Sequence, residues 1–233
     1  MSATAIITGG SRGIGLRTAA LLCEQGHRVV LVSRNAESLR KAVASLPAGQ
    51  ALAAPADVAS LDDVRRVVTQ TLEWSGRIDV LVNNAGIAST GLVEHFSPDA
   101  WDAIIATNLT AVFLCSKAVL PQMRRQRSGL IVNVVSGAGR QGYPGWSAYC
   151  ASKFGVVGFA QALREEVRVD GIRVSNIFPG SVDTQIWETF PNTFDRRQML
   201  AVDDVAGSIA WLVAQPATVW VDDLTVNYHA PVQ

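Results

Sequence analysis

The strongest constraint on the fold is a rhythm that repeats along the whole chain: a short β-branched run, a turn, and then a longer amphipathic segment. The short runs are apolar almost without interruption, as in strands that are buried on both faces of a parallel sheet. The runs are Ala5–Thr8, Val29–Ser33, Leu52–Pro55, Val80–Asn83, Leu130–Val135 and Arg173–Phe178, with a weaker one at Leu224–Asn227. They predict a parallel sheet of about seven strands.

Helical patterns lie between these runs, at Gly15–Gln25, Leu61–Trp74, Pro98–Met123, Ser147–Val169 and Asp203–Ala214. Strand, helix and strand at this spacing form right-handed crossovers. The sequence therefore predicts an α/β fold of the Rossmann type, a doubly wound parallel sheet with helices on both faces. Because no linker or repeat interrupts the pattern, we expect residues 1–233 to form a single domain.

Composition excludes several classes of protein. The chain has 233 residues, of which 48% are apolar and 17% charged, so it can fill a large core. Basic and acidic side chains balance to a formal net charge of zero, which argues against binding of nucleic acid. The three cysteines and three histidines are scattered, so we expect neither a disulfide framework nor a metal site. With no signal-peptide pattern and no apolar run of about 18 residues, a cytoplasmic protein without membrane contact is expected.

A glycine-rich turn, Thr8-Gly9-Gly10-Ser11-Arg12-Gly13-Ile14-Gly15, follows the first predicted strand and leads into a helix. Glycines let the backbone bend and approach a ligand, while the helix behind them offers free N–H groups and a positive dipole end to a pyrophosphate. The alternative, a tight turn that binds nothing, is disfavoured by the strand before it and the helix after it. We therefore predict that a dinucleotide is held by Gly9, Ser11, Arg12, Gly13, Ile14 and Gly15.

The second predicted strand ends in Ser33-Arg34-Asn35, where an NAD-specific site carries an acidic residue for the ribose 2′-hydroxyl. There is no Asp or Glu here. Arg34 is a cation, Ser33 is a hydrogen-bond donor, and Arg12 is expected to bring a second positive charge to the same corner. Two guanidinium groups suit the dianionic 2′-phosphate of NADP. We expect NADP(H) as the cofactor; two solvated surface arginines and dependence on NAD are the alternative.

Tyr149 and Lys153 lie one helical turn apart at the start of a long helical pattern, so both are on one face. A phenol with its usual pKa of about 10 is a poor acid–base group at neutral pH. A neighbouring ammonium stabilises the phenolate and lowers that pKa, so the pair can exchange a proton with an alcohol or carbonyl oxygen.

These residues resemble the short-chain dehydrogenase/reductases, in their short single-domain branch, over nearly the whole chain. Thr8–Gly15 matches the family's glycine turn, and Asn83-Asn84-Ala85-Gly86 matches the turn that supports the central sheet beside the cofactor. The other matches are Asp57-Val58 beside the adenine, Asn108, Ser136 thirteen residues before Tyr149, and the segment Pro179-Gly180-Ser181-Val182-Asp183-Thr184 that meets the nicotinamide.

The resemblance implies a catalytic tetrad of Asn108, Ser136, Tyr149 and Lys153. Tyr149 would exchange the proton with the substrate oxygen, Ser136 would hydrogen-bond that oxygen, Lys153 would lower the pKa of Tyr149 and hold the nicotinamide ribose, and Asn108 would position a water. The implied cofactor site adds to the turn residues the set Ser33, Arg34, Asp57, Val58, Asn84, Ala85, Gly86, Tyr149, Lys153, Pro179, Gly180, Val182 and Thr184.

Two segments are expected to choose the substrate, residues 137–146 and 184–199. The second carries Trp187, Phe190 and Phe194, which either form a mobile lid over an apolar pocket or simply pack on the sheet edge. Arg140 in the first segment either attracts a substrate carboxylate or, more simply, is solvated. Relatives assemble through the helix that contains Tyr149 and through the last strand, so a homodimer or homotetramer is expected. The ending Val221–Gln233 lacks the frequent Asp-Gly-Gly turn and looks more like the branch with 3-hydroxy acid and serine dehydrogenases.

The leading hypothesis is an NADPH-dependent enzyme that reduces a small-molecule carbonyl to an alcohol, or runs in reverse. Three alternatives remain: an NAD-dependent alcohol or 3-hydroxy acid dehydrogenase, an epimerase or dehydratase of the extended branch, and an NADP(H)-binding sensor or scaffold without turnover. The extended branch is disfavoured because 233 residues leave no separate substrate domain. The sensor is disfavoured because the tyrosine and the lysine are both present.

Overall fold

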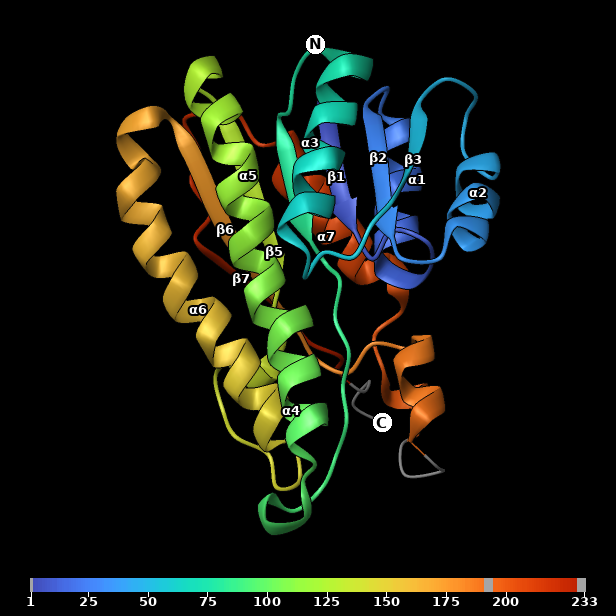
Figure 1. Cartoon of the computed structure of the whole chain (residues 1–233), viewed down its shortest axis with the longest axis vertical. Helices are drawn as coiled ribbons and strands as arrows, with labels where there is room; N and C mark the ends of the chain where they lie inside the picture. Colours follow the sequence, from blue (N-terminus) through green and yellow to red (C-terminus); the bar gives the residue numbers. More distant parts are fainter. Residues whose placement is uncertain (1, 191–194, 230–233) are drawn as a thin grey trace.

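The computed structural model describes residues 2–190 and 195–229. Within them, seven strands form one parallel sheet in the order β3-β2-β1-β4-β5-β6-β7 (Figure 1). The strands are β1 (Thr4–Thr8), β2 (Arg28–Ser33), β3 (Ala51–Pro55), β4 (Val80–Asn83), β5 (Gly129–Val134), β6 (Ile172–Pro179) and β7 (Asp223–Val226). The predicted doubly wound sheet is confirmed, with each predicted strand within about one residue of its observed bounds.

Helices cover both faces of the sheet. On one face, α1 (Gly13–Glu24), α2 (Ala36–Ala44) and α7 (Val202–Ala214) pack on side chains such as Ile7 and Leu31. On the other face, α3 (Leu61–Ser75), α5 (Ala111–Gln126) and α6 (Ser147–Val167) pack on neighbours such as Ile6 and Val30. Successive strand residues thus point into opposite cores, which explains why the strands are apolar without alternation.

Two helical predictions were incomplete. Helix α2 was missed: it has only nine residues, of which Leu39 and Ala42 are buried, and its start is marked by Asn35, whose side chain accepts from the Ser38 N–H. The predicted helix Pro98–Met123 consists of α4 (Pro98–Ile105), a π-helical turn at Ala106–Thr110, and α5. The apolar pattern of this run was interpreted as one continuous helix, and the π turn within it was not predicted.

The run Pro98–Gln126 is long and apolar enough to cross a membrane by length and composition alone. In the fold, its buried side chains face the sheet and its neighbours, among them Val112, Cys115, Val119 and Met123. The run is therefore a core helix of this domain.

A buried row of amides crosses the sheet near the carboxyl ends of its strands. Asn83, Asn133, Asn176 and Asp223 are in register on β4, β5, β6 and β7. Asn83 Nδ2 donates to Asn133 Oδ1 at 2.9 Å, Asn133 Nδ2 to Asn176 Oδ1 at 3.0 Å, and Asn176 Nδ2 to Asp223 Oδ1 at 3.2 Å. Each amide is less than 5% exposed. The row fixes the relative register of the strands whose ends carry the site.

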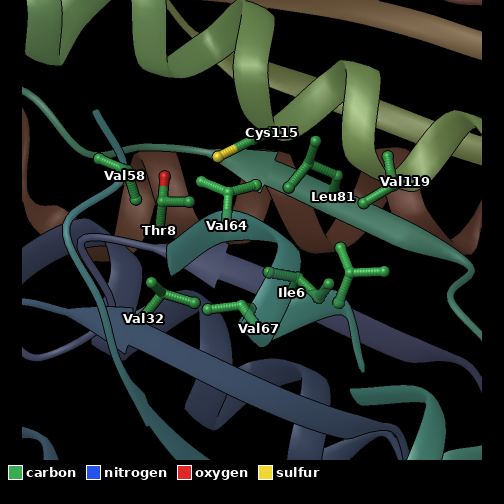
Figure 2. A pocket seen from close by; sticks show the side chains of 10 residues that line it. Ile6, Thr8, Val32, Val58, Val64, Val67, Leu81, Cys115 and Val119 are labelled. Atoms are coloured by element: carbon green, nitrogen blue, oxygen red, sulfur yellow. The ribbon is translucent and has the colours of Figure 1, made fainter. Parts of the chain in front are cut away.

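A small cavity of about 10 Å³ lies between the sheet and helices α3 and α5 (Figure 2). Its lining is almost wholly apolar and includes Val32, Val58, Val64 and Cys115. At that volume it is a packing gap behind the cofactor edge of the sheet, too small for a substrate.

Candidate active site

The glycine turn is locked to the end of β4 by the hydroxyl of Thr8. Thr8 Oγ1 accepts from the Asn84 and Ala85 N–H groups at 2.9 and 3.0 Å and donates to the Val82 carbonyl at 3.3 Å. The Asn84 amide donates in turn to the Thr8 carbonyl at 2.9 Å and the Gly9 carbonyl at 3.3 Å. The structure therefore places the predicted residues Asn84 and Ala85 directly against the turn. Thr8 was not among the predicted site residues, although a threonine that ends a strand before a glycine turn is a usable signal.

Three glycines of the turn, Gly9, Gly10 and Gly15, have no room for a side chain. A Cβ at Gly15 would lie 2.5 Å from the Gly9 carbonyl oxygen and 2.7 Å from Asn84 Nδ2. A Cβ at Gly9 would lie 2.9 Å from the same amide nitrogen, and Gly9 also has φ +65°. Gly13, with φ +55°, begins α1. The turn is thus a backbone cradle at a helix N-terminus, which is the geometry that suits a pyrophosphate.

The corner next to the turn brings Ser11 and Ser33 together, with their hydroxyls 3.3 Å apart. Arg34 follows Ser33 and is exposed; within residues 2–190 and 195–229, no hydrogen bond or ion pair engages its guanidinium. Arg12 Nη1 donates to Gln185 Oε1 at 2.9 Å, and its approach to a 2′-phosphate beside Arg34 stays a prediction. Arg12 thereby links the glycine turn to the segment after β6.

Asp57 and Val58 lie in the loop between β3 and α3. The Asp57 carboxylate accepts from the Ala59 N–H at 3.0 Å, and the Asp57 N–H donates to Asp63 at 2.8 Å. Val58 is 7% exposed and packs beside Val32. Both residues therefore lie at the carboxyl edge of the sheet, on the side of β2 and β3.

Tyr149 and Lys153 lie on the first turns of α6, with the Lys153 Nζ 5.6 Å from the centre of the Tyr149 ring. Lys153 is 5% exposed, and its Nζ donates to the Val134 carbonyl at the end of β5 at 2.9 Å. Ser136 follows the same strand, and its side chain hydrogen-bonds Tyr149. The structure therefore brings Ser136, Tyr149 and Lys153 together, as the sequence predicted.

Burial controls the ionisation of this pair. It raises the pKa of Tyr149 to about 12, against a smaller lowering by the hydrogen bond to Ser136. It lowers the pKa of Lys153 to about 8. The net direction for the pKa of Tyr149 is upward because removal from water favours the neutral phenol, and the lowering of that pKa by Lys153 stays a prediction.

Asn108 lies in the π turn between α4 and α5 and is 1% exposed. Its side-chain amide makes two hydrogen bonds with the backbone of Ile87. Asn108 Oδ1 accepts from the Ile87 N–H at 2.9 Å, and Asn108 Nδ2 donates to the Ile87 carbonyl at 2.9 Å. It also donates to Ser152 Oγ at 3.2 Å, and that hydroxyl donates to the Tyr149 carbonyl at 2.7 Å. Asn108 thereby joins the loop after Gly86 to the turn of α6 that carries Tyr149. Ser152 was not predicted for this role.

The segment after β6 lies over the glycine turn. The Gly180 N–H donates to the Val226 carbonyl at 2.8 Å, and Val182 pairs with Leu200 in an isolated parallel bridge. The Thr184 methyl would contact a Cβ at Gly13 at 3.8 Å. Of the residues predicted to meet the nicotinamide, Thr184 thus comes next to the glycine turn, while Gly180 and Val182 are held by β7 and Leu200.

Three aromatic rings gather beside Tyr149. The ring centre of Trp146 lies 5.7 Å from that of Tyr149, 5.1 Å from that of Phe190 and 6.1 Å from that of Trp187. Trp187 and Phe190 belong to the expected lid segment, which forms 3₁₀ turns at Gln185–Thr189 and Arg196–Gln198; Phe194 lies outside the described residues. The part played by Trp146 was missed, although its place three residues before Tyr149 puts it at the N-terminus of α6.

The Arg140 side chain is exposed to solvent and also has partners within the fold. Its guanidinium lies 3.8 Å from the centre of the Phe178 ring and bonds Thr225 Oγ1 at 2.7 Å and Asp223 Oδ2 at 3.4 Å. The segment after Ser136 is thereby fastened to β7 and, through Asp223, to the row of buried amides.

Comparison with known proteins gives consistent matches over most of the chain. The family model described as short chain dehydrogenase matches residues 3–193. A 3-oxoacyl-(acyl-carrier-protein) reductase of Synechocystis is 38% identical, over 96% of this chain and 94% of the relative. A solved alcohol dehydrogenase of the archaeon Thermococcus sibiricus, complexed with 5-hydroxy-NADP, aligns with a TM-score of 0.91 at 27% identity over the whole of both chains. A metagenomic short-chain oxidoreductase in complex with NADP aligns with a TM-score of 0.84 at 33% identity, over 98% of each chain.

Proposed function

The chain belongs to the short-chain dehydrogenase family, and we propose that it is an NADPH-dependent reductase that converts a small-molecule carbonyl to an alcohol, or the reverse. The observation that carries this proposal is the meeting of Ser136, Tyr149 and Lys153 beside a glycine cradle at the carboxyl edge of the sheet. Acid–base groups beside a dinucleotide cradle are what hydride transfer to a carbonyl requires.

In the proposed reduction, NADPH supplies the hydride when bound, and the protein handles the proton. Ser136 hydrogen-bonds the carbonyl oxygen and stabilises the negative charge that develops there. Tyr149 donates its phenolic proton to that oxygen, which completes the alcohol. Its raised pKa keeps Tyr149 protonated at neutral pH, so the phenol carries the proton that this direction requires. Lys153 holds the nicotinamide ribose, and Asn108 fixes the turn of α6 on which Tyr149 stands.

The preference for NADPH rests on the corner formed by Ser11, Ser33 and Arg34. An exposed arginine without a protein partner among the described residues is available to a 2′-phosphate, and both serine hydroxyls can donate to it. The two solved structures complexed with NADP or its derivative support this assignment. We expect NADPH to bind more tightly than NADH, and Arg34→Asp to reverse the order. A wild-type preference for NADH would refute it and favour the NAD-dependent alternative.

The experiment for the reaction is NADPH oxidation by the purified protein with a panel of ketones, aldehydes, quinones, 3-oxo esters and a 3-oxoacyl thioester, with isolation of the alcohol. The thioester is included because the Synechocystis relative is named for that class. Formation of the alcohol supports the proposal. If NADPH binds firmly and no carbonyl is reduced, the sensor or scaffold hypothesis takes its place.

We also propose that the protein is a homo-oligomer in which α5 and α6 meet the partner. Phe113 on α5 and Phe154 on α6 are 44% and 46% exposed, and Phe113 contacts Phe159 of α6 edge-on at 6.1 Å between ring centres. Exposed rings on neighbouring helices are typical of a covered surface. Light scattering with Phe113→Ser/Phe154→Ser beside the wild type tests it: the wild type should be dimeric or tetrameric and the variant smaller, whereas a monomeric wild type would refute the proposal.

A further inference from the structure

Three aromatic rings, Trp146, Trp187 and Phe190, pack against one another and are called the aromatic wall. The wall adjoins Tyr149 through Trp146. The three ring centres of the wall lie 5.1 to 6.1 Å apart, in edge-on or tilted arrangements. The indole Nε1 of Trp187 donates to the Val182 carbonyl at 2.8 Å, and Val182 is itself held by its bridge to Leu200. All three residues are only partly buried, so each ring retains accessible surface.

The cationic side chains of this region are already engaged. Arg140 bonds Asp223 and Thr225, Arg196 is paired with Asp183, and Arg12 bonds Gln185. Arg197 is paired with Asp195, and Lys153 is buried against Val134. Among the described residues of the two substrate segments, each arginine thus has a protein partner. A carboxylate or phosphate on the substrate would have to compete for these cations.

Exposed apolar side chains stand at the rim of the same region, beside the exposed Glu94 and His95. The Gly91 N–H donates to the Gly145 carbonyl at 2.9 Å, which joins the loop after β4 to the segment before α6. Next to that link, Leu92 and Val93 are 58% and 73% exposed, and Tyr143 is 42% exposed. Large apolar side chains at a site entrance favour an uncharged, apolar ligand.

The distance between Trp146 and Tyr149 indicates where an apolar ligand would carry an aromatic ring. Tyr149 must reach the carbonyl oxygen, and the Trp146 ring centre is 5.7 Å from its own. On the Trp146 side of Tyr149, a ring bonded directly to the carbonyl carbon can come within the range of about 4.5–7 Å at which aromatic rings interact. Building on the proposed reductase function, we propose that the substrate is a neutral aryl ketone, whose ring lies against Trp146, Trp187 and Phe190.

The test compares acetophenone with cyclohexyl methyl ketone, which has the same carbon skeleton with a saturated ring. The quantity measured is the ratio of their kcat/KM values with NADPH, so the intrinsic reactivity of the two ketones cancels between variants. Each aromatic contact is worth about two- to twelvefold. We expect the ratio to fall about fivefold in Trp146→Leu and in Trp187→Leu, and to be retained in Trp187→Phe, which keeps a ring. Trp211→Leu is the matched control, because Trp211 is a half-exposed tryptophan on α7.

NADPH affinity, measured for each variant, shows whether the fold and the cofactor site are intact. A ratio that is unchanged in both leucine variants, while the wild type reduces ketones, overturns the aryl assignment and leaves the reductase standing. A wild type that prefers ethyl acetoacetate or a 3-oxoacyl thioester to acetophenone also overturns it, in favour of a linear substrate. Absence of turnover with every carbonyl despite bound NADPH overturns the proposed function, and this proposal with it.

Discussion

Replacing Gly15 by alanine tests the cradle on which cofactor binding depends. The new Cβ would stand 2.5 Å from the Gly9 carbonyl oxygen and 2.7 Å from Asn84 Nδ2. Both atoms belong to hydrogen bonds that lock the turn to β4, so neither can withdraw without breaking one. Either α1 or the turn must move.

The size of the effect follows from two opposing terms. Overpacking by one methyl group costs about 1–3 kcal/mol. Replacing glycine by alanine within a helix raises the unfolding free energy by about 0.5–1 kcal/mol. The expected net loss of unfolding free energy is therefore about 1–2 kcal/mol, which lowers Tm by about 2–8 °C in a domain of this size.

Gly207→Ala in α7 is the matched control, because a Cβ there would meet nothing within 4 Å. It should raise the unfolding free energy by about 0.5–1 kcal/mol. Urea and thermal unfolding followed by circular dichroism measure both variants, and a fluorescence titration gives NADPH affinity. We expect Gly15→Ala alone to weaken NADPH binding, by about tenfold for each 1.4 kcal/mol by which the binding free energy falls. If Gly15→Ala matches Gly207→Ala in stability and binds NADPH like the wild type, the cradle argument is wrong.

Three further predictions concern ionisation and the buried amides. Because the pKa of Tyr149 is raised to about 12, alcohol oxidation, which needs the phenolate, should speed up as pH rises above 8, while carbonyl reduction should not; an oxidation optimum near pH 7 would contradict this. Because the pKa of Lys153 is about 8 in the folded chain and 10.5 as its ordinary value, the unfolded chain binds more protons there between these pH values. The unfolding free energy of the wild type should therefore rise relative to that of Lys153→Met as the pH increases from 8 to 10.5. If urea unfolding shows the same difference between the two proteins at both pH values, the lowered pKa is refuted. Asn133→Leu leaves the Asn83 donor and the Asn176 acceptor without their partner, so it should cost about 2–5 kcal/mol of unfolding free energy; a loss below about 1 kcal/mol would show that the row contributes little.

The fold was predictable from the sequence because its strands are buried on both faces. Runs such as Val29–Ser33 and Val80–Asn83 are apolar throughout, and the spacing between them leaves room for one crossover helix. Helix α2 was missed because it buries two side chains, too few to create a periodic signal. The π turn was missed because its cause lies in tertiary contacts: Asn108 bonds Ile87 and Ser152, both far from it in sequence.

The members of the candidate site were predictable, while their ionisation and their partners were not. Motif spacing brings Ser136, Tyr149 and Lys153 to one edge of the sheet, since each follows the end of a strand or begins a helix there. The pKa of Tyr149 depends on how much water the fold removes, which no motif encodes. Likewise, no motif shows that Arg12 bonds Gln185 or that Arg140 bonds Asp223, because these partners lie more than 80 residues away in the sequence.

The most direct test of the proposed reaction is the turnover of Tyr149→Phe with saturating NADPH and a carbonyl that the wild type reduces. Phenylalanine preserves the ring against Trp146 and removes only the phenolic hydroxyl, so NADPH affinity should stay near that of the wild type. We expect kcat for carbonyl reduction to fall by about 10²- to 10⁴-fold. Turnover within tenfold of the wild type, with NADPH still bound, would contradict the assignment of Tyr149 as the proton donor.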